Sequence, residues 1–402
     1  MSLQNNVEKV ITQIRSFLKA EIGLVYTTVG QTGSSLLGGV FWLLLASLLS
    51  VENYGLTNYY IALASIFSAT ALFGLDATVI SWMAKGDKRI LFEANSIVFV
   101  SGLTVAALLS IFQWPSGFLS FSMVFFMMTL AETFGKKKYK EYAVLSIGNR
   151  LVQIGLSVAL YFPLGLIGIV LGYFFGNLIF SFLYLKTITK FTTKMESVKS
   201  KRSFALHSYG FNLIKSFTNY LDKIIIAPIF GYYVLGLYQL GFQFFMFLSI
   251  IPLSLYYYLL PEESSGSNKD KIKILGFVLS VIAALAVFAL TPFLVGRFFA
   301  SFVNAIPVVR VMCFAVIPST IVSILNASLL GRGKSKTVLI AGLIYLASLI
   351  TFLIFLGQNM GAFGLALTLV IAQSFQAIYL LLRTLFPLSF FQNTQVSRKL
   401  SK

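Results

Sequence analysis

Polar residues that could bind a ligand lie inside long apolar stretches of this sequence. One group within residues 206–230 is spaced so that it shares one face of a helix: Asn212, Lys215, Ser216, Asn219, Asp222 and Lys223. A second group within residues 141–162 repeats this spacing: Ser146, Asn149, Arg150, Gln153 and Ser157. Polar stripes of this length predict a water-filled cavity, with a buried ion pair that only fixes helix packing as the alternative.

Three further charged residues stand in or near apolar stretches. Arg310 lies close enough to the end of its stretch for its guanidinium to reach the surface, so a functional role and snorkelling are both open. Asp76 is compatible with a gating role and with anchoring of the following loop. Glu132 stands one turn before Lys136, which predicts an ion pair between them.

The composition places these residues in a membrane protein. Of 402 residues, 57% are hydrophobic and 11% are charged, against about 25% charged residues in soluble domains. This excludes a soluble globular protein, a disordered chain and a collagen-like fibre. The sequence also has no phosphate-binding glycine loop, zinc-protease motif or Cys/His ligand set. We therefore expect no enzyme activity, no cofactor and no metal.

The fold predicted is an all-α membrane protein of about twelve transmembrane helices in two six-helix bundles. Each expected span has about 20 or more mainly apolar residues, and short polar or Gly/Pro-rich turns separate most of them. The expected spans are 24–50, 56–83, 90–112, 117–138, 141–162, 164–186, 206–230, 233–260, 272–295, 303–330, 337–357 and 361–386.

The positive charges support this topology. The net charge is +18, and 26 of the 31 Lys and Arg residues fall on the side that holds both termini. The positive-inside rule then predicts cytoplasmic termini and a multi-pass protein of the cell membrane. It also accounts for the basic residues without a nucleic-acid partner.

The expected domain organisation follows the longest polar connection. It comprises an interfacial amphipathic helix (1–20), an N-terminal six-helix bundle (21–189), a cytoplasmic linker (190–205), a C-terminal six-helix bundle (206–388) and a cytoplasmic tail (389–402).

Two pairs of short segments suggest that the bundles are repeats. Tyr54-Gly55-Leu56-Thr57 corresponds to Leu235-Gly236-Leu237-Tyr238, and Gly165-Leu166-Ile167-Gly168 corresponds to Gly361-Ala362-Phe363-Gly364. Because each half has an even number of spans, the repeats run parallel and predict a pseudo-two-fold axis along the membrane normal. Glycine pairs are also common helix-packing signals, which is the alternative.

In these features the sequence resembles the multidrug/oligosaccharidyl-lipid/polysaccharide exporter superfamily, and within it the oligosaccharide-lipid flippases of polysaccharide biosynthesis. The resemblance rests on Tyr54-Gly55-Leu56, Phe73-Gly74-Leu75-Asp76-Ala77-Thr78, Asp222-Lys223, Phe230-Gly231, Gly236-Leu237-Tyr238, Leu329-Leu330-Gly331-Arg332-Gly333-Lys334 and Gly361-x-x-Gly364. It implies alternating access that moves a polyprenyl-diphosphate-linked oligosaccharide from the cytoplasmic to the outer leaflet. The implied partners are this substrate, membrane lipids, and glycosyltransferases and a polymerase of the same pathway.

Within this interpretation the intramembrane residues receive roles. The cations would bind the diphosphate (Arg150, Lys215, Lys223 and Arg310), the amides would bind sugar hydroxyls (Asn149, Gln153, Asn212 and Asn219), and two carboxylates would serve coupling or gating (Asp76 and Asp222). We expect Asp222 to pair with Lys223 or with a cation of another helix until substrate competes for that cation. A cation-coupled multidrug exporter and a non-transporting membrane scaffold are the alternative functions.

Overall fold

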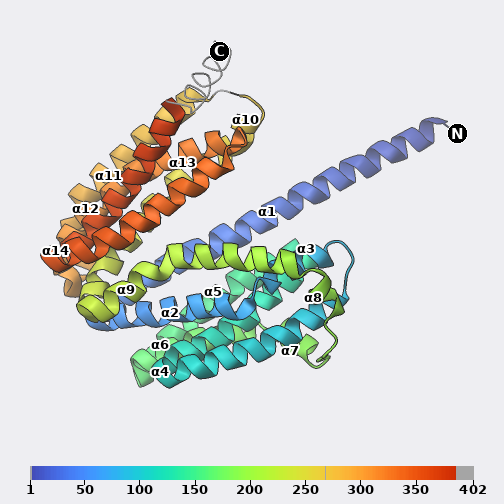
Figure 1. Ribbon diagram of the computed structural model, residues 1–402, viewed down its shortest axis with the longest axis horizontal. Helices are drawn as coiled ribbons and strands as arrows, with labels where there is room; N and C mark the ends of the chain where they lie inside the picture. The colour runs from blue at the N-terminus through green and yellow to red at the C-terminus, as the bar shows by residue number, and fades with distance from the viewer. Residues whose placement is uncertain (1, 268, 386–402) are drawn as a thin grey trace, which may run out of the picture. The chain divides into compact units, whose positions relative to one another are not determined.

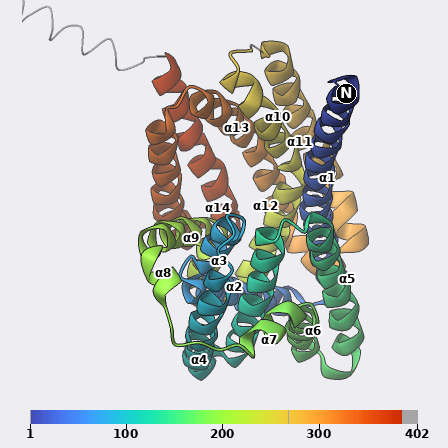
Figure 2. The same ribbon diagram turned by 90° about the vertical axis from the view of Figure 1, so that its right-hand side faces the viewer.

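The computed structural model describes residues 2–267 and 269–385, and for residues 2–21 only the helical backbone. Helices and no strands make up the described residues, which confirms the all-α prediction (Figures 1 and 2). The α-helices are α1 Ser2–Leu48, α2 Val51–Leu72, α3 Leu75–Met83, α4 Arg89–Gly135, α5 Tyr139–Leu164, α6 Leu166–Ile179, α7 Phe182–Ile188, α8 Glu196–Ser200, α9 Arg202–Leu248, α10 Ile250–Ser264, α11 Asp270–Phe298, α12 Ile306–Met312, α13 Val316–Gly331 and α14 Ser335–Leu385. Two 3₁₀ helices, η1 Ala300–Ala305 and η2 Cys313–Ala315, flank α12. The expected tail, 389–402, lies outside the described residues.

Seven helical stretches of the described residues are long and apolar enough to cross a membrane, or nine if the bent pairs α2–α3 and α6–α7 each form one span. Three of the longest helices also contain a residue with non-helical backbone angles, at Gln113 in α4, Gly231 in α9 and Gly361 in α14. The breaks at Gln113 and Gly231 lie at turns expected between two spans, and Gly361 is the first residue of the last expected span. The number of twelve crossings stays a prediction.

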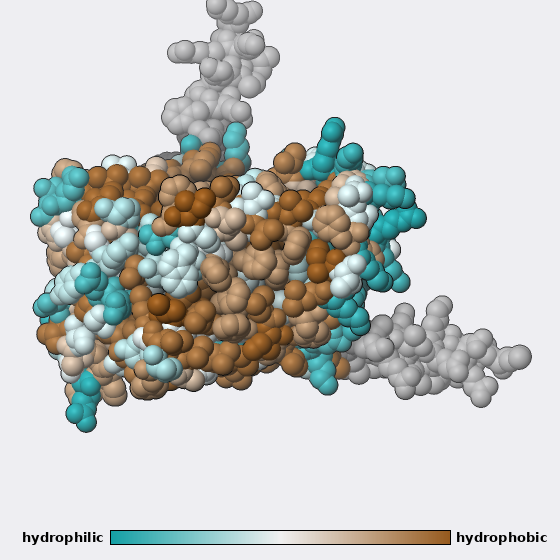
Figure 3. Space-filling view, turned by 90° about the horizontal axis from the view of Figure 1, so that it is seen from below, coloured by the Kyte–Doolittle hydropathy of each residue, from teal (hydrophilic) through white to brown (hydrophobic). Residues whose placement is uncertain are grey.

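The outer faces of these helices suit a lipid environment. Large hydrophobic side chains such as Ile111, Phe112 and Phe162 are at least 75% exposed. Figure 3 shows one face of the molecule on which hydrophobic residues predominate beside smaller groups of hydrophilic ones. Apolar surface of this extent is stable in contact with acyl chains and costly in contact with water. The predicted interfacial helix is continuous with the first span in α1, and its place at the interface stays a prediction.

The chain forms two compact units. Unit 1 comprises Met1–Phe41 and Thr57–Ile224, and unit 2 comprises Trp42–Leu56 and Ile225–Lys402. Their limits differ from those of the two expected bundles, because the start of α2 groups with unit 2 and the first part of α9 groups with unit 1. The contacts described below for Gly55 and for Asp76 account for both exchanges.

Each unit has its own buried core. In unit 1 the fully buried ring of Tyr184 stacks on Phe125 at 4.6 Å between ring centres, and its hydroxyl donates a hydrogen bond to the carbonyl of Asn95. In unit 2 the buried hydroxyls of Ser280 and Thr320 lie 2.7 Å apart and join α11 to α13. These buried polar groups therefore have partners within their own unit, which offsets the cost of removing them from water.

Both hairpins that begin with a Gly-x-x-Gly segment have the same local structure. Gly165 has φ 59° and ψ −136°, and Gly361 has φ 57° and ψ −140°. One turn later, a Cβ on Gly168 would lie 2.0 Å from the carbonyl oxygen of Leu160, and one on Gly364 would lie 2.0 Å from that of Leu356. When Gly165 is aligned with Gly361, the backbone angles and the close contacts of the two hairpins therefore correspond, as the glycines do.

The second pair of segments meets within unit 2. A Cβ on Gly55 would lie 1.9 Å from the carbonyl oxygen of Tyr232, and one on Gly236 would lie 2.0 Å from that of Val51. The register that pairs Gly55 with Gly236 also pairs Val51 with Tyr232. The contact of Gly55 with Tyr232 is therefore equivalent to the contact of Gly236 with Val51. A two-fold axis requires such reciprocal contacts.

The linker between the predicted bundles is attached to the start of α4. The Ser197 hydroxyl donates a hydrogen bond of 2.6 Å to Asp87, and the Val198 amide donates one of 2.9 Å to the buried Glu93. The Ser197 bond holds the pKa of the Asp87 carboxyl below its ordinary value. The linker is thus a docked element of unit 1.

Candidate functional site

Close packing of α6 on α5 builds the first part of the site. A Cβ on Gly172 would lie 2.3 Å from the backbone nitrogen of Ser157, and one on Gly176 would lie 2.5 Å from the side chain of Gln153. Together with Gly168, these glycines recur at every fourth position along one face of α6. Small residues at this spacing let two membrane helices approach until their backbones touch.

A buried amide network fills the space between α4, α5 and α6. The side-chain oxygen of Asn177 accepts hydrogen bonds from the side-chain amides of Gln153 at 2.7 Å and Asn149 at 3.2 Å. The side-chain nitrogen of Asn177 donates to the Ser122 hydroxyl at 3.1 Å, and that of Asn149 also donates to the backbone carbonyl of Gly176. The amides of Asn149 and Gln153, which the sequence assigns to sugar binding, are therefore engaged with protein groups here.

Arg150 extends from this network. One terminal nitrogen of its guanidinium donates to the side-chain oxygen of Gln153 at 3.0 Å and to the Tyr173 hydroxyl at 3.2 Å. Its Nε is buried and has no partner among the described residues. A Cβ on Gly38 of α1 would lie 3.5 Å from that Nε. The hydrogen bonds of this half-buried cation thus go to neutral groups, which do not compensate its charge.

The second half of the chain shows what the same hairpin looks like without these polar residues. In the register that pairs Gly165 with Gly361, leucines replace three members of the network (Leu346 for Arg150, Leu349 for Gln153 and Leu369 for Tyr173), whereas Tyr345 corresponds to Asn149 and Gln373 to Asn177. Leu349 and Leu369 are buried. Packing of the hairpin therefore does not require the polar cluster, which favours a ligand-binding role for it.

The first part of α9 carries the second predicted stripe, and a break in the preceding helices positions it. Phe73 and Gly74 have positive φ angles between α2 and α3, and the Phe73 ring packs on Tyr209 at 5.4 Å. This turn brings Asp76 to Asn212, whose amide nitrogen lies 3.1 Å from both carboxylate oxygens. The structure thus joins one predicted gating residue to one predicted substrate residue.

Asp222 and Lys223 form a buried ion pair further along α9. Each is only 4% exposed, and the Lys223 ammonium lies 3.1 Å from the Asp222 carboxylate and donates to the carbonyl of Asn219 at 3.0 Å. The same ammonium lies 5.8 Å from the ring centre of Tyr220. Lys223 is one of the two partners expected for Asp222.

The remaining predicted residues have different surroundings. The Lys215 and Asn219 side chains are exposed, and Lys215 interacts electrostatically with Asp76. Arg310 lies in unit 2, where its Nε donates to the carbonyl of Phe288 at 3.2 Å. Pro292 has no N–H to bond that carbonyl, so Arg310 supplies the missing donor. This contact gives Arg310 a structural role, and substrate binding by it stays a prediction.

Other members of the site and the predicted ion pair can also be placed. The sequence interpretation did not include Tyr173, Asn177 and Ser122. Asn177 is the only amide or charged residue of α6, a signal that could have drawn attention to it.

The predicted pair of Glu132 with Lys136 is confirmed. No group of three or more His, Cys, Asp or Glu residues in the described part of the chain could hold a metal ion.

These features define a class of protein, a multi-span all-α membrane protein with a polar cluster held between its helices. Comparisons with known proteins agree. Residues 116–254 match the family model described as polysaccharide biosynthesis protein, and this region contains the Arg150 cluster and the polar stripe of α9. No curated protein matches the chain in sequence.

Solved structures share the fold. The inward closed conformation of the lipid II flippase MurJ is 15% identical, with a TM-score of 0.67 over 90% of this chain and 88% of that one. An inward-facing multidrug resistance MATE transporter of the MOP superfamily is 14% identical, with a TM-score of 0.69 over 92% and 99%. The eukaryotic MATE transporter AtDTX14 gives 0.52 at 16% identity over 92% and 96%. The chain thus has the fold of this transporter superfamily, which confirms the resemblance seen in the sequence.

Proposed function

We propose that this protein is a flippase that moves a polyprenyl-diphosphate-linked oligosaccharide from the cytoplasmic to the outer leaflet by alternating access. It would act in the cell membrane with both termini in the cytoplasm and supply surface polysaccharide synthesis, alongside glycosyltransferases and a polymerase of that pathway. The family match to polysaccharide biosynthesis proteins supports this choice within the superfamily.

Arg150 is the observation that carries the proposal. A guanidinium held within the protein by neutral partners stabilises an anion brought to it, and the planar fork suits a phosphate. Lys215 is an exposed second cation in the same unit. Lys223 is engaged with Asp222, so a diphosphate would have to compete with that carboxylate for it.

The sugar contacts need an opening of the amide network. Asn149 and Gln153 bond Asn177 in this conformation, whereas Asn219 is exposed. Asn212 bonds Asp76, so a sugar hydroxyl at Asn212 would release the carboxylate. This exchange of partners is how Asp76 would respond to bound substrate.

The proposal is tested in reconstituted vesicles with a fluorescent polyprenyl-diphosphate oligosaccharide. Arg150→Ala with Lys215→Ala should slow its transfer between leaflets at least about tenfold, because a hydrogen bond to a charged group contributes about 1.5–3 kcal/mol. The matched control is Lys140→Ala with Arg297→Ala, which also removes one lysine and one arginine. Both of these residues are exposed, and neither belongs to the proposed substrate site. Equal rates for both double variants, at equal protein content, would remove Arg150 and Lys215 from the substrate site.

A multidrug exporter is the second candidate, because a MATE transporter shares the fold at a TM-score of 0.69, against 0.67 for the lipid II flippase. A cationic drug is disfavoured by the charge of Arg150. Efflux of a cationic dye from the same vesicles, with no transfer of the oligosaccharide lipid, would establish this function instead. Loss of polysaccharide in cells that lack the protein, while transfer fails in vesicles, would favour the scaffold.

A further inference from the structure

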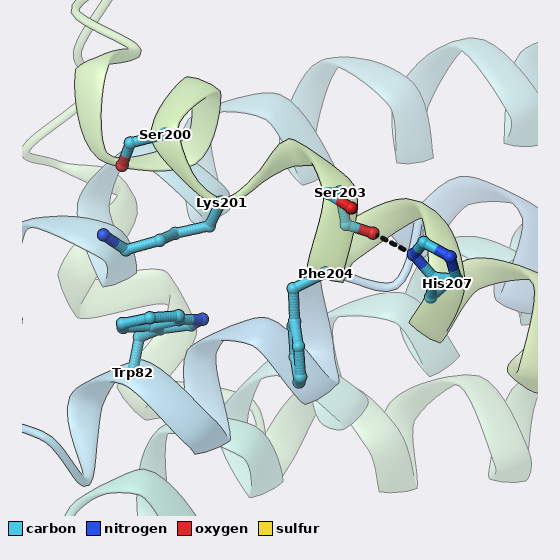
Figure 4. Close-up of a pocket in the computed structure, with 6 residues that line it drawn as sticks. All are labelled: Trp82, Ser200, Lys201, Ser203, Phe204 and His207. Atoms are coloured by element: carbon cyan, nitrogen blue, oxygen red, sulfur yellow. Dashed lines mark hydrogen bonds between the residues drawn. The ribbon is translucent and has the colours of Figure 1, made fainter.

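A pocket of about 460 Å³ lies between α3 and the end of the linker, and none of the residues proposed to bind substrate lines it (Figure 4). Its lining residues are Trp82, Ser200, Lys201, Ser203, Phe204 and His207. Trp82 comes from α3, and the others come from α8, the start of α9 and the residue between these helices. All of them belong to unit 1. None has a part in the proposed transport mechanism.

Two ammonium groups stand over the indole ring. The Lys201 Nζ lies 4.2 Å from the Trp82 ring centre, and the Lys85 Nζ lies 4.3 Å from it. Figure 4 shows the Lys201 side chain extended along the ring, with Phe204 between Trp82 and His207. An aromatic ring attracts a cation without neutralising its charge. The ring thus leaves both charges unneutralised; Lys201 belongs to the pocket lining, and Lys85 lies outside it.

Hydrogen-bond donors accompany these charges. The Trp82 Nε1 is buried and has no acceptor among the described residues. The Ser203 hydroxyl adds a further donor on the linker side, whereas the Ser200 hydroxyl already donates to the carbonyl of Ser197 at 2.8 Å. His207 is already bonded through Nδ1 to the carbonyl of Ser203. The pocket therefore offers donors and positive charge, which suit the oxygens of a phosphate.

Asp87 does not form an ion pair with these cations. Asp87 interacts electrostatically with Lys201, but its oxygens accept hydrogen bonds from the Ser197 hydroxyl and from the backbone amides of Arg89 and Ile90. No ion pair of Lys85 or Lys201 occurs among the described residues. The lining carries no carboxylate, so the pocket has a net positive charge.

An apolar surface adjoins the pocket. Phe204 is 41% exposed, and Leu206 and Phe211 on the same helix are 65% and 68% exposed. Tryptophan with lysine beside exposed apolar residues is typical of the interface between membrane and water. A ligand there would present an anionic group to the cations and hydrocarbon to α9. This combination is found in a lipid and not in a free anion.

We propose that this pocket binds the headgroup phosphate of an anionic glycerophospholipid of the membrane. Lys201 supplies the charge within the pocket and Lys85 adds to it from outside the lining, the Trp82 Nε1 and the Ser203 hydroxyl donate to the phosphate oxygens, and Phe204 contacts the glycerol and the acyl chains. Because donors from α3 and from the linker share one phosphate, the bound lipid stabilises the docked linker. Clusters of Lys and Arg at the cytoplasmic membrane surface attract anionic lipids in this way.

Trp82 itself reports on this binding. The protein has three tryptophans, so Trp42→Phe with Trp114→Phe leaves Trp82 as the only source of indole emission. The purified full chain in a neutral detergent is titrated with short-chain phosphatidylglycerol, short-chain phosphatidylcholine or inorganic phosphate. We expect a saturable change with phosphatidylglycerol only. If the double variant does not fold, the difference in emission between the unaltered protein and Trp82→Phe gives the same signal.

Two single variants locate the site. Lys201→Gln should weaken phosphatidylglycerol binding about fivefold, the effect of one cation near an anionic lipid. Lys194→Gln removes an exposed cation of the same linker outside the pocket and should leave the affinity unchanged. Equal affinities for both variants, or saturation by phosphatidylcholine, would overturn the proposal. Saturation by inorganic phosphate without a response to phosphatidylglycerol would also overturn the proposal, because it would show that the pocket binds a free anion. None of these readouts depends on transport.

Discussion

Replacing Gly236 by alanine should destabilise the protein, although alanine is the better helix former. In an exposed helix interior, Gly→Ala stabilises by up to about 1 kcal/mol. At this position the new Cβ would lie 2.0 Å from the carbonyl oxygen of Val51, whereas an ordinary contact begins at 3.4 Å. The start of α2 would have to move away by the difference between these two distances. Overpacking of this kind costs about 1–3 kcal/mol.

The assay is the unfolding of purified protein in detergent, with Gly342→Ala as the control. Gly342 also lies within a helix, and nothing stands within 4 Å of a Cβ placed on it. Its substitution should be neutral or stabilising.

The reciprocal contact adds a second expectation. Gly55→Ala should also destabilise, and the double variant should lose less than the sum of the single losses, because one movement of α2 relieves both clashes. If Gly236→Ala unfolds at the same denaturant concentration as Gly342→Ala, or if the two losses add fully, the close crossing of these segments is refuted.

Two further predictions concern the buried ion pair and the linker. Asp222→Asn should change the rate of oligosaccharide-lipid transport, because the substrate would no longer compete with a carboxylate for Lys223; an unchanged rate would leave Asp222 a packing residue. Asp87→Asn or Ser197→Ala should speed trypsin cleavage between residues 190 and 202, since their hydrogen bond holds the linker. That bond lowers the pKa of Asp87 in the folded protein. The stability that the bond gives to the docked linker is therefore present above pH 3.8, the ordinary pKa of the carboxyl group, and is lost as the pH falls through the lower pKa of the folded state. A linker cleaved equally fast in the unaltered protein and in Asp87→Asn would contradict this attachment.

The helices and the repeated segments were predictable from the sequence because they depend on local signals. Apolar length gives the spans, and a positive φ selects glycine at Gly165 and Gly361 alike. The pair of Glu132 with Lys136 was also predictable, since one helical turn separates them.

Lys223 was among the expected partners of Asp222, but the partners that come from other helices were not predictable, because they lie in distant parts of the chain. Asn212 meets Asp76 from a different helix, and the break at Phe73 and Gly74 that permits this gives no periodic signal. Helical spacing showed that Gln153 shares a face with Arg150. It could not show that Asn177 of another helix occupies its amide.

The two versions of the Gly-x-x-Gly hairpin bear on how this protein can change during evolution. The positions that hold the hairpin together, such as Gly168 and Gly364, are fixed by contacts with backbone atoms that no larger side chain could make. The positions that carry chemistry are separate from these, and the leucines at 346 and 349 show that the hairpin tolerates very different side chains there. Substrate preference can therefore drift by substitution at 150 and 153 while the joint between the helices stays unchanged.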